Sequence, residues 1–504
     1  MSIPFQGKEI TFTQPDGTTL RVRGHGDQHF AFFETLDGYT LVEDPVSGFY
    51  QYATVSDDGA DLVPTGLLPG RIAPVALGIA PGVHITPDAA RAKARTIPGL
   101  PVGSTRWRER RRRATRERHM QLGPGILPAP PQRTTTGDFV GLCLLVEFPD
   151  VVHSITRDEV EAFCNDPGYR GFDNNGSVYD YFFDSSRGKL RYNTVVAEYY
   201  TAKHPRAYYT NEQIQQPIRA WELIKEALAA LRARGFDFSR LTVDDERCVY
   251  ALNVFYAGDV VNNWAQGLWP HSHHLQTRVE LAPGIFAYDY QFTNMGPELS
   301  LGTYCHENGH MICDFPDLYD YGYESSGVGA YCLMCAGANA DPKNPTGVGA
   351  YLKYRAGWAD RVTVVEPGMR GVLRAGINEF LIHARNRSEY YLVENRLQRG
   401  RDAALPDSGL TIWRIDENGD NSDEQMSPRR HYECSLVQAD GRFDLERRQW
   451  ERGDDGDLFG APGATRFGPD TTPNSAWWDG TPSGLEIHDI SAPGPSIELV
   501  TNLR

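Results

Sequence analysis

One short segment of the chain has the residue types and the spacing to bind and use a metal ion, His306-Glu307-Asn308-Gly309-His310. Two histidines four positions apart on a helix point the same way, about one turn apart, so that both imidazoles can bind one ion. A glutamate beside the first histidine can accept a proton from a water molecule on that ion. The segment therefore predicts a zinc site with its own general base, which still needs a third protein ligand and one open position.

Five residues alone leave a second interpretation open, in which the histidines are buried polar residues of an ordinary helix and Glu307 faces solvent. The residues that follow favour the metal site. Asp314, Asp317 and Asp320 come shortly afterwards, and Pro316 prevents the helix from continuing smoothly. A helix that ends there can return an acidic side chain to the metal.

A third segment, Tyr331–Cys335 followed by Ala336–Ala338, suits a tight turn that carries one methionine. Together, the H-E-x-G-H segment, Pro316–Asp320 and Leu333-Met334 resemble the immune inhibitor A family of secreted zinc metallopeptidases, within the metzincins. The resemblance extends over most of the chain from about Asp138, with further similar segments at Val146–Asp150, Gly176–Tyr181, Leu268–His271, Tyr391–Arg396, Ser408–Trp413 and Gln438–Gly441.

The resemblance implies a zinc site in an α/β catalytic domain of metzincin type. The third ligand of the family corresponds to Asp317, and the methionine of the turn beneath the metal corresponds to Met334. Two departures keep Asp314 as the rival ligand: Cys313 stands where the family usually has glycine, and one extra residue separates His310 from the Pro-Asp pair.

Other residues offer alternatives. Glu324 would be the third ligand of a thermolysin-like site, although it lies in a segment rich in glycine and serine. His271, His273 and His274 form a possible second metal cluster, but their Trp-Pro loop suits a substrate cleft or the surface. By analogy with the family, the sheet edge near Trp269 and His271 would hold an extended substrate.

The function that follows is a zinc endopeptidase acting on protein or peptide substrates. Glu307 would take the proton of the attacking water and pass it to the leaving amine. The alternative is a catalytically impaired, peptidase-like binding protein, which the departures at Cys313 and after His310 keep open. The intact Glu307 argues against it, because a scaffold without catalysis has no chemical need for this residue.

Composition restricts the partners and the compartment. With 504 residues, a net charge of −16 and 40% hydrophobic residues, the chain has the composition of a multidomain globular protein and not of one that mainly binds nucleic acid. We find no apolar run of membrane-spanning length. The segment from Met1 to Glu9 lacks the apolar core of a secretion signal, which indicates a cytoplasmic protein, whereas the family resemblance implies secretion.

Eight cysteines are too few for a disulfide framework in a chain of this length. Four of them, Cys305, Cys313, Cys332 and Cys335, bracket the predicted metal site. We expect small buried thiols or one disulfide. The pair Cys332-x-x-Cys335 leaves a structural metal as the alternative.

Four regions are expected, which make a multidomain α+β or α/β chain. Residues 1–100 read as a β-rich N-terminal domain that is either structural or a propeptide of a zymogen, and residues 101–136 as an Arg- and Pro-rich linker. Residues 137–361 form the catalytic domain, and residues 362–504 a β-rich region. The arginine run at 106–118 is expected to be solvated or proteolytically labile, rather than an arm for nucleic acid or membrane.

Local patterns predict the main elements. A buried strand is expected at 139–146, an amphipathic helix at 218–231 and a second buried strand at 248–256. Strands dominate the C-terminal region. Two acidic turns, Glu417–Asp420 and Asp454–Asp457, leave Ca²⁺ binding open beside plain solvated turns, since carboxylate oxygens bind hard cations.

Overall fold

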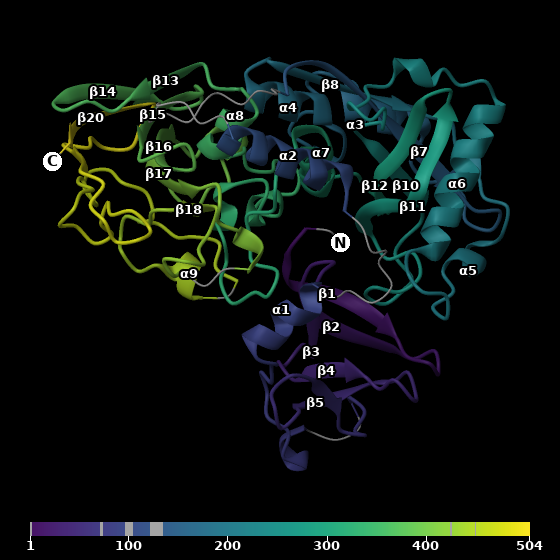
Figure 1. Ribbon diagram of the computed structural model, residues 1–504. Helices are drawn as coiled ribbons and strands as arrows, with labels where there is room; N and C mark the ends of the chain where they lie inside the picture. Colours follow the sequence, from purple (N-terminus) through teal and green to yellow (C-terminus); the bar gives the residue numbers. More distant parts are fainter. Residues whose placement is uncertain are drawn as a thin grey trace.

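The computed structural model describes residues 3–70, 74–95, 104–120, 135–423, 426–448 and 450–503. It is a mixed α/β structure with several sheets, in which an N-terminal β-rich part meets the two larger parts near the centre of the molecule (Figure 1). The predicted coarse fold class is thus confirmed.

The N-terminal part is one antiparallel sheet in which each strand pairs with the next along the chain. Glycines with positive φ at Gly17, Gly38 and Gly48 form its turns, where a side chain would strain the backbone. The strands are β1 (Phe5–Thr13), β2 (Thr19–Gly26), β3 (Ala31–Thr35), β4 (Thr40–Glu43), β5 (Tyr50–Val55) and β6 (Leu62–Pro64).

The central part contains a second sheet, with the strand order β11-β12-β10-β7-β8 and with β9 paired to β7. Neighbouring strands are parallel except for β11, which runs antiparallel to β12 at one edge. These strands are β7 (Gly137–Glu147), β8 (Leu190–Val196), β9 (Tyr200–Thr201), β10 (Leu252–Ala257), β11 (His271–Ala282) and β12 (Ile285–Met295). The two predicted buried strands correspond to β7 and β10.

Helices pack around this sheet and beside it. The predicted amphipathic helix is α6, whose apolar side is buried against the sheet through Trp221, Ile224 and Leu228. The helices of the chain are α1 (Pro87–Arg95), α2 (Arg106–Met120), α3 (Arg157–Asn165), α4 (Val178–Ser186), α5 (Arg206–Tyr209), α6 (Ile218–Ala233), α7 (Leu301–Cys313), α8 (Ala350–Arg355) and α9 (Asp444–Arg447).

The C-terminal region is β-rich, as expected, and holds two sheets with the orders β13-β15-β16-β17-β18 and β14-β20-β19. Its core does not stop at residue 362: Trp413 and Ile382 belong to the same cluster of buried residues as Trp358 and Met334. The strands are β13 (Arg361–Val364), β14 (Met369–Arg374), β15 (Glu379–Ala384), β16 (Glu389–Arg396), β17 (Gly409–Asp416), β18 (Cys434–Leu436), β19 (Leu485–His488) and β20 (Ser496–Leu503).

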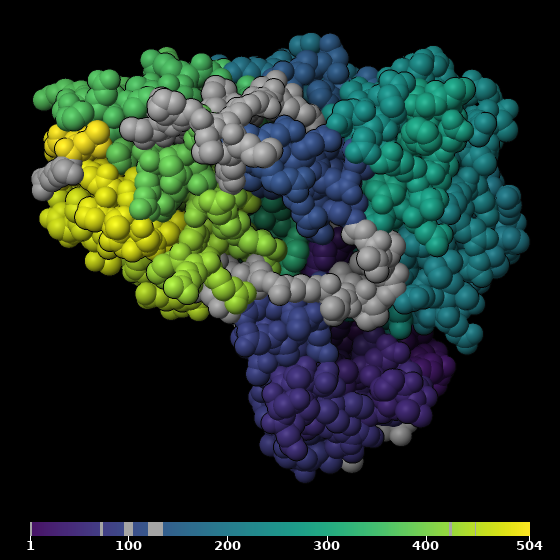
Figure 2. Space-filling view, viewed as in Figure 1, coloured from purple at the N-terminus to yellow at the C-terminus, as the bar shows by residue number. Residues whose placement is uncertain are grey.

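The arginine run is not a solvated linker, and this expectation was wrong. Residues 106–120 form α2, which packs against α7 and β12, and the side chains of Arg106, Arg110 and Arg118 are buried. Figure 2 shows α2 lying between the C-terminal region and the edge of the central part. The helix is buried because its guanidinium groups find carboxylates from distant parts of the chain. Residues 101–103 and 121–134 of the expected linker lie outside the described residues.

Of the two states expected for the cysteines, the structure shows small buried thiols. All eight cysteines are free and buried, so that the alternative of one disulfide is wrong. Cys332 and Cys335 belong to the main core cluster, and no metal-binding group among the described residues includes them.

Among the described residues, no helix is both long enough and apolar enough to cross a membrane.

Candidate metal centre

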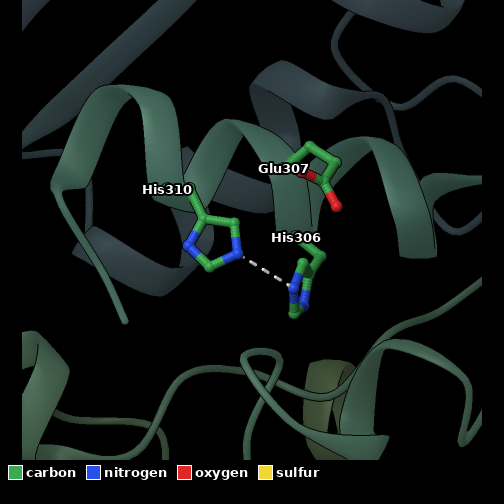
Figure 3. A group of neighbouring side chains, drawn as sticks. All are labelled: His306, Glu307 and His310. Atoms are coloured by element: carbon green, nitrogen blue, oxygen red, sulfur yellow. Dashed lines mark hydrogen bonds between the residues drawn. The ribbon is translucent and has the colours of Figure 1, made fainter. Parts of the chain in front are cut away.

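Three ligand atoms converge beside α7. The Nε2 atoms of His306 and His310 lie 3.2 Å apart, and Figure 3 shows both rings projecting from the same side of the helix. The Oδ1 atom of Asp317 lies 3.0 Å from Nε2 of His306 and 3.3 Å from Nε2 of His310. All three residues are buried.

These three distances fit a zinc ion. Zinc binds nitrogen and oxygen ligands at about 2.0–2.1 Å in a tetrahedron, whose geometry puts ligand atoms about 3.3 Å apart. The triangle formed by the two imidazoles and the carboxylate therefore has edges of the length that three of four tetrahedral ligands require. The donor set, two neutral imidazoles and one carboxylate, is also one that zinc accepts.

Glu307 adds a second carboxylate to the site. Its ligand atom lies within 4.8 Å of those of His306 and His310, and its side chain is buried. Neither of its carboxylate oxygens has a hydrogen-bond partner among the described residues. Because an uncompensated buried carboxylate is costly, this position calls for a proton donor from outside the protein's own side chains, such as a water molecule on a metal.

The turn after α7 is made by Asp314. The helix runs to Cys313 and ends at Asp314, which has a left-handed conformation with φ 56° and ψ 30°. Aspartate tolerates this region better than most residues with a side chain. The left-handed turn therefore comes one residue later than Cys313, and the chain still brings Asp317 back to the histidines.

Each ligand is oriented by a further hydrogen bond on its other polar atom. Nδ1 of His306 lies 2.9 Å from the carbonyl oxygen of Leu333, and Nδ1 of His310 lies 2.6 Å from that of Phe315. The hydroxyl of Tyr321 donates to Oδ2 of Asp317 at 2.6 Å. Such outer contacts set the tautomer and the orientation of metal ligands.

The charges within the site hold Asp317 in the form that binds a metal, whereas the raised pKa of His306 favours its protonated form, whose proton a metal ion would have to displace. Burial opposes ionisation of Asp317, but the neighbouring His310 and the hydrogen bonds from both histidines hold its pKa well below the usual value. Burial would also lower the pKa of His306, but its hydrogen bond with Asp317 and the charge of that carboxylate raise it instead. Asp317 is therefore held as a carboxylate, the form that coordinates metal ions.

Gly309 and Met334 pack together beneath the two histidines. A Cβ atom on Gly309 would lie 2.9 Å from the sulfur of Met334, which is closer than side-chain atoms normally come. Met334 is fully buried, and its carbonyl oxygen accepts a hydrogen bond from the backbone N–H of Leu318 at 2.8 Å. The glycine thus permits the segment around Met334 to approach α7 closely.

Asn308 projects from the side of α7 opposite to the two histidines and contacts the central sheet. Its Oδ1 accepts a hydrogen bond from the hydroxyl of Tyr192 in β8 at 2.8 Å, and its Nδ2 donates to Oδ1 of Asn253 in β10 at 2.9 Å. The side chain of Gln291 in β12 donates to the same Asn253 oxygen. Four buried polar side chains from three strands and the helix therefore set the rotation of α7 about its axis.

The rival third ligands lie elsewhere. Asp314 forms an ion pair with Arg110 at 2.7 Å, and Glu324 forms one with Arg91 at 3.1 Å. Both carboxylates are thus engaged by arginines, whereas Asp317 contacts both histidines. The geometry therefore brings Asp317, and not Asp314 or Glu324, to the pair of imidazoles.

Trp269 and His271, predicted near the substrate cleft, are both buried; His271 is the first residue of β11, and Trp269 lies two residues before it. His271 contacts the carbonyl oxygen of Trp269 at 2.7 Å and the hydroxyl of Tyr290 at 2.9 Å, and burial lowers its pKa to about 4. No metal-binding group of the described residues contains His271, His273 or His274. The role of this edge strand in binding substrate stays a prediction.

Of the two acidic turns, the second gathers Asp440, Asp454 and Asp457 with ligand atoms within 4.8 Å of one another. Asp454 and Asp440 both pair with Arg442, and Asp457 accepts hydrogen bonds from Tyr331 and the backbone of Asp454. These contacts occupy part of the carboxylate oxygens, while Oδ1 of Asp454 is buried without a hydrogen-bond partner among the described residues, and calcium binding here stays a prediction.

Residues far from the motif cover the site, and they were not recognised in the sequence. Trp107 of α2 stacks on His310, and Arg108 donates to the hydroxyl of Tyr321 at 3.1 Å. His29, between β2 and β3, stacks on Tyr321 with ring centroids 4.2 Å apart. The only local signal was a tryptophan within a run of arginines, since an aromatic ring in such a run needs a surface to pack on.

The neighbouring Gln28 makes a contact of a different kind. Its side-chain amide donates to the carbonyl oxygen of Ser272 at 3.1 Å and accepts from the Ser272 N–H at 2.8 Å. Ser272 lies in the edge strand β11, so that Gln28 pairs with this edge as the backbone of a further strand would. The N-terminal part therefore contacts both the metal centre and the adjoining sheet edge.

Comparisons with known proteins add no information about this site. No protein-family model matches the chain, and no curated protein matches its sequence.

Proposed function

We propose that this protein is a zinc-dependent endopeptidase with its catalytic centre at α7. The observation that carries the proposal is the triangle of His306, His310 and Asp317, with edges of 3.0–3.3 Å, beside a buried Glu307 that lacks a hydrogen-bond partner among the described residues. The resemblance to the immune inhibitor A family supports the same activity.

The residues divide the work in the following way. His306, His310 and Asp317 would hold the ion, and a zinc ion bound there supplies a lowered pKa for water and polarises a peptide carbonyl. Glu307 takes the proton of the attacking water and delivers it to the leaving amine. Tyr321, Leu333 and Phe315 keep the three ligands in the orientation that binding requires.

The test is the variant Glu307→Gln. Glutamine keeps the shape of the side chain but cannot accept the proton, so hydrolysis of casein or a quenched peptide should fall at least about a hundredfold. Zinc content, measured on the purified protein, should stay near one ion per chain, because Glu307 is not one of the three ligands.

The matched control is Glu280→Gln, which changes an exposed glutamate near the turn between β11 and β12 that belongs to no metal-binding group of the described residues, and it should leave the rate unchanged. Hydrolysis by Glu307→Gln at the rate of the unmodified protein would refute the assignment of the base. A chain that binds zinc but hydrolyses nothing before or after removal of its N-terminal part would favour the peptidase-like binding protein instead.

A further inference from the structure

The cleft beside the metal centre is filled by α2, and the contacts of this helix reveal the chemistry of the cleft. At its N-terminal end, Trp107 covers His310 and Arg108 reaches the hydroxyl of Tyr321. The helix therefore begins at the metal centre, and Figures 1 and 2 show that it lies between the central part and the C-terminal region. Any other occupant of the cleft would contact the same residues that line α2.

The wall on the side of the central sheet is acidic. The Oδ2 atom of Asp244 accepts from Nε of Arg106 at 3.1 Å and from Nη1 of Arg110 at 3.2 Å. The carboxylate of Asp289 in β12 accepts from the backbone N–H groups of Arg106 and Trp107, at 2.8 and 3.1 Å, and so caps the helix. The side chain of Asp244 is fully buried.

The wall on the side of the C-terminal region is acidic as well. A pocket of about 470 Å³ lies between α2 and this wall. Among the described residues that line this pocket outside α2, there is no lysine or arginine but there are four acidic residues. These are Asp317, Glu417, Asp420 and Glu433. The metal ligand Asp317 shares this pocket, so the acidic wall continues directly from the metal centre.

The pairing across this pocket is one of arginine with carboxylate. Arg111 forms an ion pair with Glu433, and Arg118 forms one with Glu417 at 3.0 Å. Glu417 also pairs with Arg355 at 2.9 Å, so it keeps a cation without α2. In the ion pairs of the described residues, Glu433 and Asp244 have cations from α2 alone.

Departure of α2 would leave these two carboxylates without the cations that now pair with them. A carboxylate in a cleft without a cation is unfavourable, and a second occupant that carries cations would restore the pairing. Guanidinium groups suit the position best, because their planar fork matches a carboxylate and they are weakly hydrated.

We propose that the cleft is a binding site for arginine-rich polypeptides, that α2 occupies it in this structure, and that the substrates of the open site are of the same basic class. The part that concerns hydrolysis rests on the proposed peptidase function, whereas the binding itself does not. Arginine side chains of the substrate replace those of Arg106, Arg110 and Arg111 at Asp244 and Glu433.

The experiment uses the full chain with a recognition sequence for a site-specific protease placed within residues 123–132. The chain also carries Glu307→Gln, so that binding is measured without hydrolysis. After cutting, the probe is a free peptide with the sequence of residues 104–120, compared with an analogue in which every arginine is glutamine. Release of the N-terminal fragment from the cut chain is followed by size-exclusion chromatography.

The arginine peptide should release the fragment at a concentration at least tenfold lower than the glutamine analogue, and added salt should reduce this difference between the two peptides. Glu433→Gln should reduce the same difference, because it removes a carboxylate that binds arginine, whereas Glu280→Gln should not change it. Equal release by both peptides, or release by neither, would overturn the proposal, and the salt dependence tests it even if Glu433→Gln does not fold.

A second arm separates binding from catalysis. With Glu307 restored, the cut chain should hydrolyse arginine-rich peptides at least tenfold faster than neutral peptides of the same length. Faster cleavage of neutral peptides would overturn the substrate class. Selective release of the fragment without any hydrolysis would support the binding site and refute the peptidase function alone.

Discussion

The indole ring of Trp107 lies almost parallel to the imidazole of His310, with ring centroids 4.5 Å apart and ring planes 18° apart. Trp107 itself is buried. In the proposed reaction a peptide bond would have to come close to the same imidazole, so α2 and a substrate could not occupy this place together. The stacking of Trp107 on His310 therefore places α2 where the proposed substrate would bind.

The choice of the third ligand can be measured directly. Asp317→Ala removes a carboxylate that lies 3.0 and 3.3 Å from the two imidazoles, and zinc affinity should fall more than about a hundredfold. Asp314→Ala should leave zinc affinity nearly unchanged but destabilise the fold by about 1–3 kcal/mol, because Arg110 loses a partner. Zinc titration and thermal unfolding of both variants decide between the residues, and the reverse ranking would move the ligand to Asp314.

Tyr321 should affect the metal without touching it. Tyr321→Phe removes the hydroxyl that donates to Oδ2 of Asp317 at 2.6 Å, and the zinc Kd should rise about 10- to 100-fold. Tyr179→Phe is the control, since Tyr179 stacks on Phe183 in α4. An unchanged Kd in Tyr321→Phe would show that the hydroxyl does not hold the carboxylate.

The pH dependence of stability should reveal the buried Asp27. Burial raises its pKa from 3.8 to about 7, so its protonated form is favoured in the folded chain, and this contribution to stability is lost as the pH rises through 7. Asp27→Asn keeps an uncharged side chain at every pH. The variant should therefore be more stable than the unmodified protein at pH 8, by at most about 4 kcal/mol, with a smaller difference at pH 5.

His29 acts in the opposite direction and has to be tested separately. Burial lowers its pKa from 6.5 to about 3, so the folded chain loses stability as the pH falls below 6.5. His29→Gln should remove this loss on the acidic side. Urea unfolding at pH 5 and pH 8 measures both variants, and parallel curves for all three proteins would contradict both assignments.

Limited trypsin digestion should leave α2 intact. Residues 106–118 are helical, and Arg106, Arg110 and Arg118 are buried in ion pairs, so cleavage there requires local unfolding. The first fragments of the native protein should therefore end outside this range, whereas digestion in urea should cut within it. Mass spectrometry of the fragments checks both, and an early native cut at Arg112 or Arg116 would contradict the burial of the helix.

The same digestion tests whether the N-terminal part keeps the proposed peptidase latent. Gln28 pairs with the edge strand at Ser272, and His29 and Trp107 cover residues of the metal centre. The full chain should therefore be less active than protein from which residues 1–120 have been released. Equal activity before and after release would make this part a structural domain.

What the sequence predicted well depends on short-range patterns. The spacing of His306 and His310 implies a common helix face because both lie within α7. The strands β7 and β10 and the helix α6 follow from local apolar patterns, since each buries the face that its own residues define.

What could not be predicted depends on partners that are distant in the chain. Arg110 is buried because Asp244 and Asp314 meet it from two different elements, and no local pattern of charges contains that information. The resemblance favoured Asp317 as third ligand but left Asp314 open as the rival, because the choice depends on the left-handed residue at the end of α7. Tyr321 has no spacing rule that would mark it as the partner of a metal ligand.

The network of Asn308 with Tyr192, Asn253 and Gln291 has a thermodynamic consequence for the metal. These contacts hold α7 on the sheet through side chains that do not bind the ion, so little conformational entropy remains to be lost when zinc arrives. Unlike a zinc finger, whose folding and metal binding are one event, the chain should keep its secondary structure after dialysis against a chelator. Loss and regain of the ion then become a reversible control of activity that leaves the architecture unchanged.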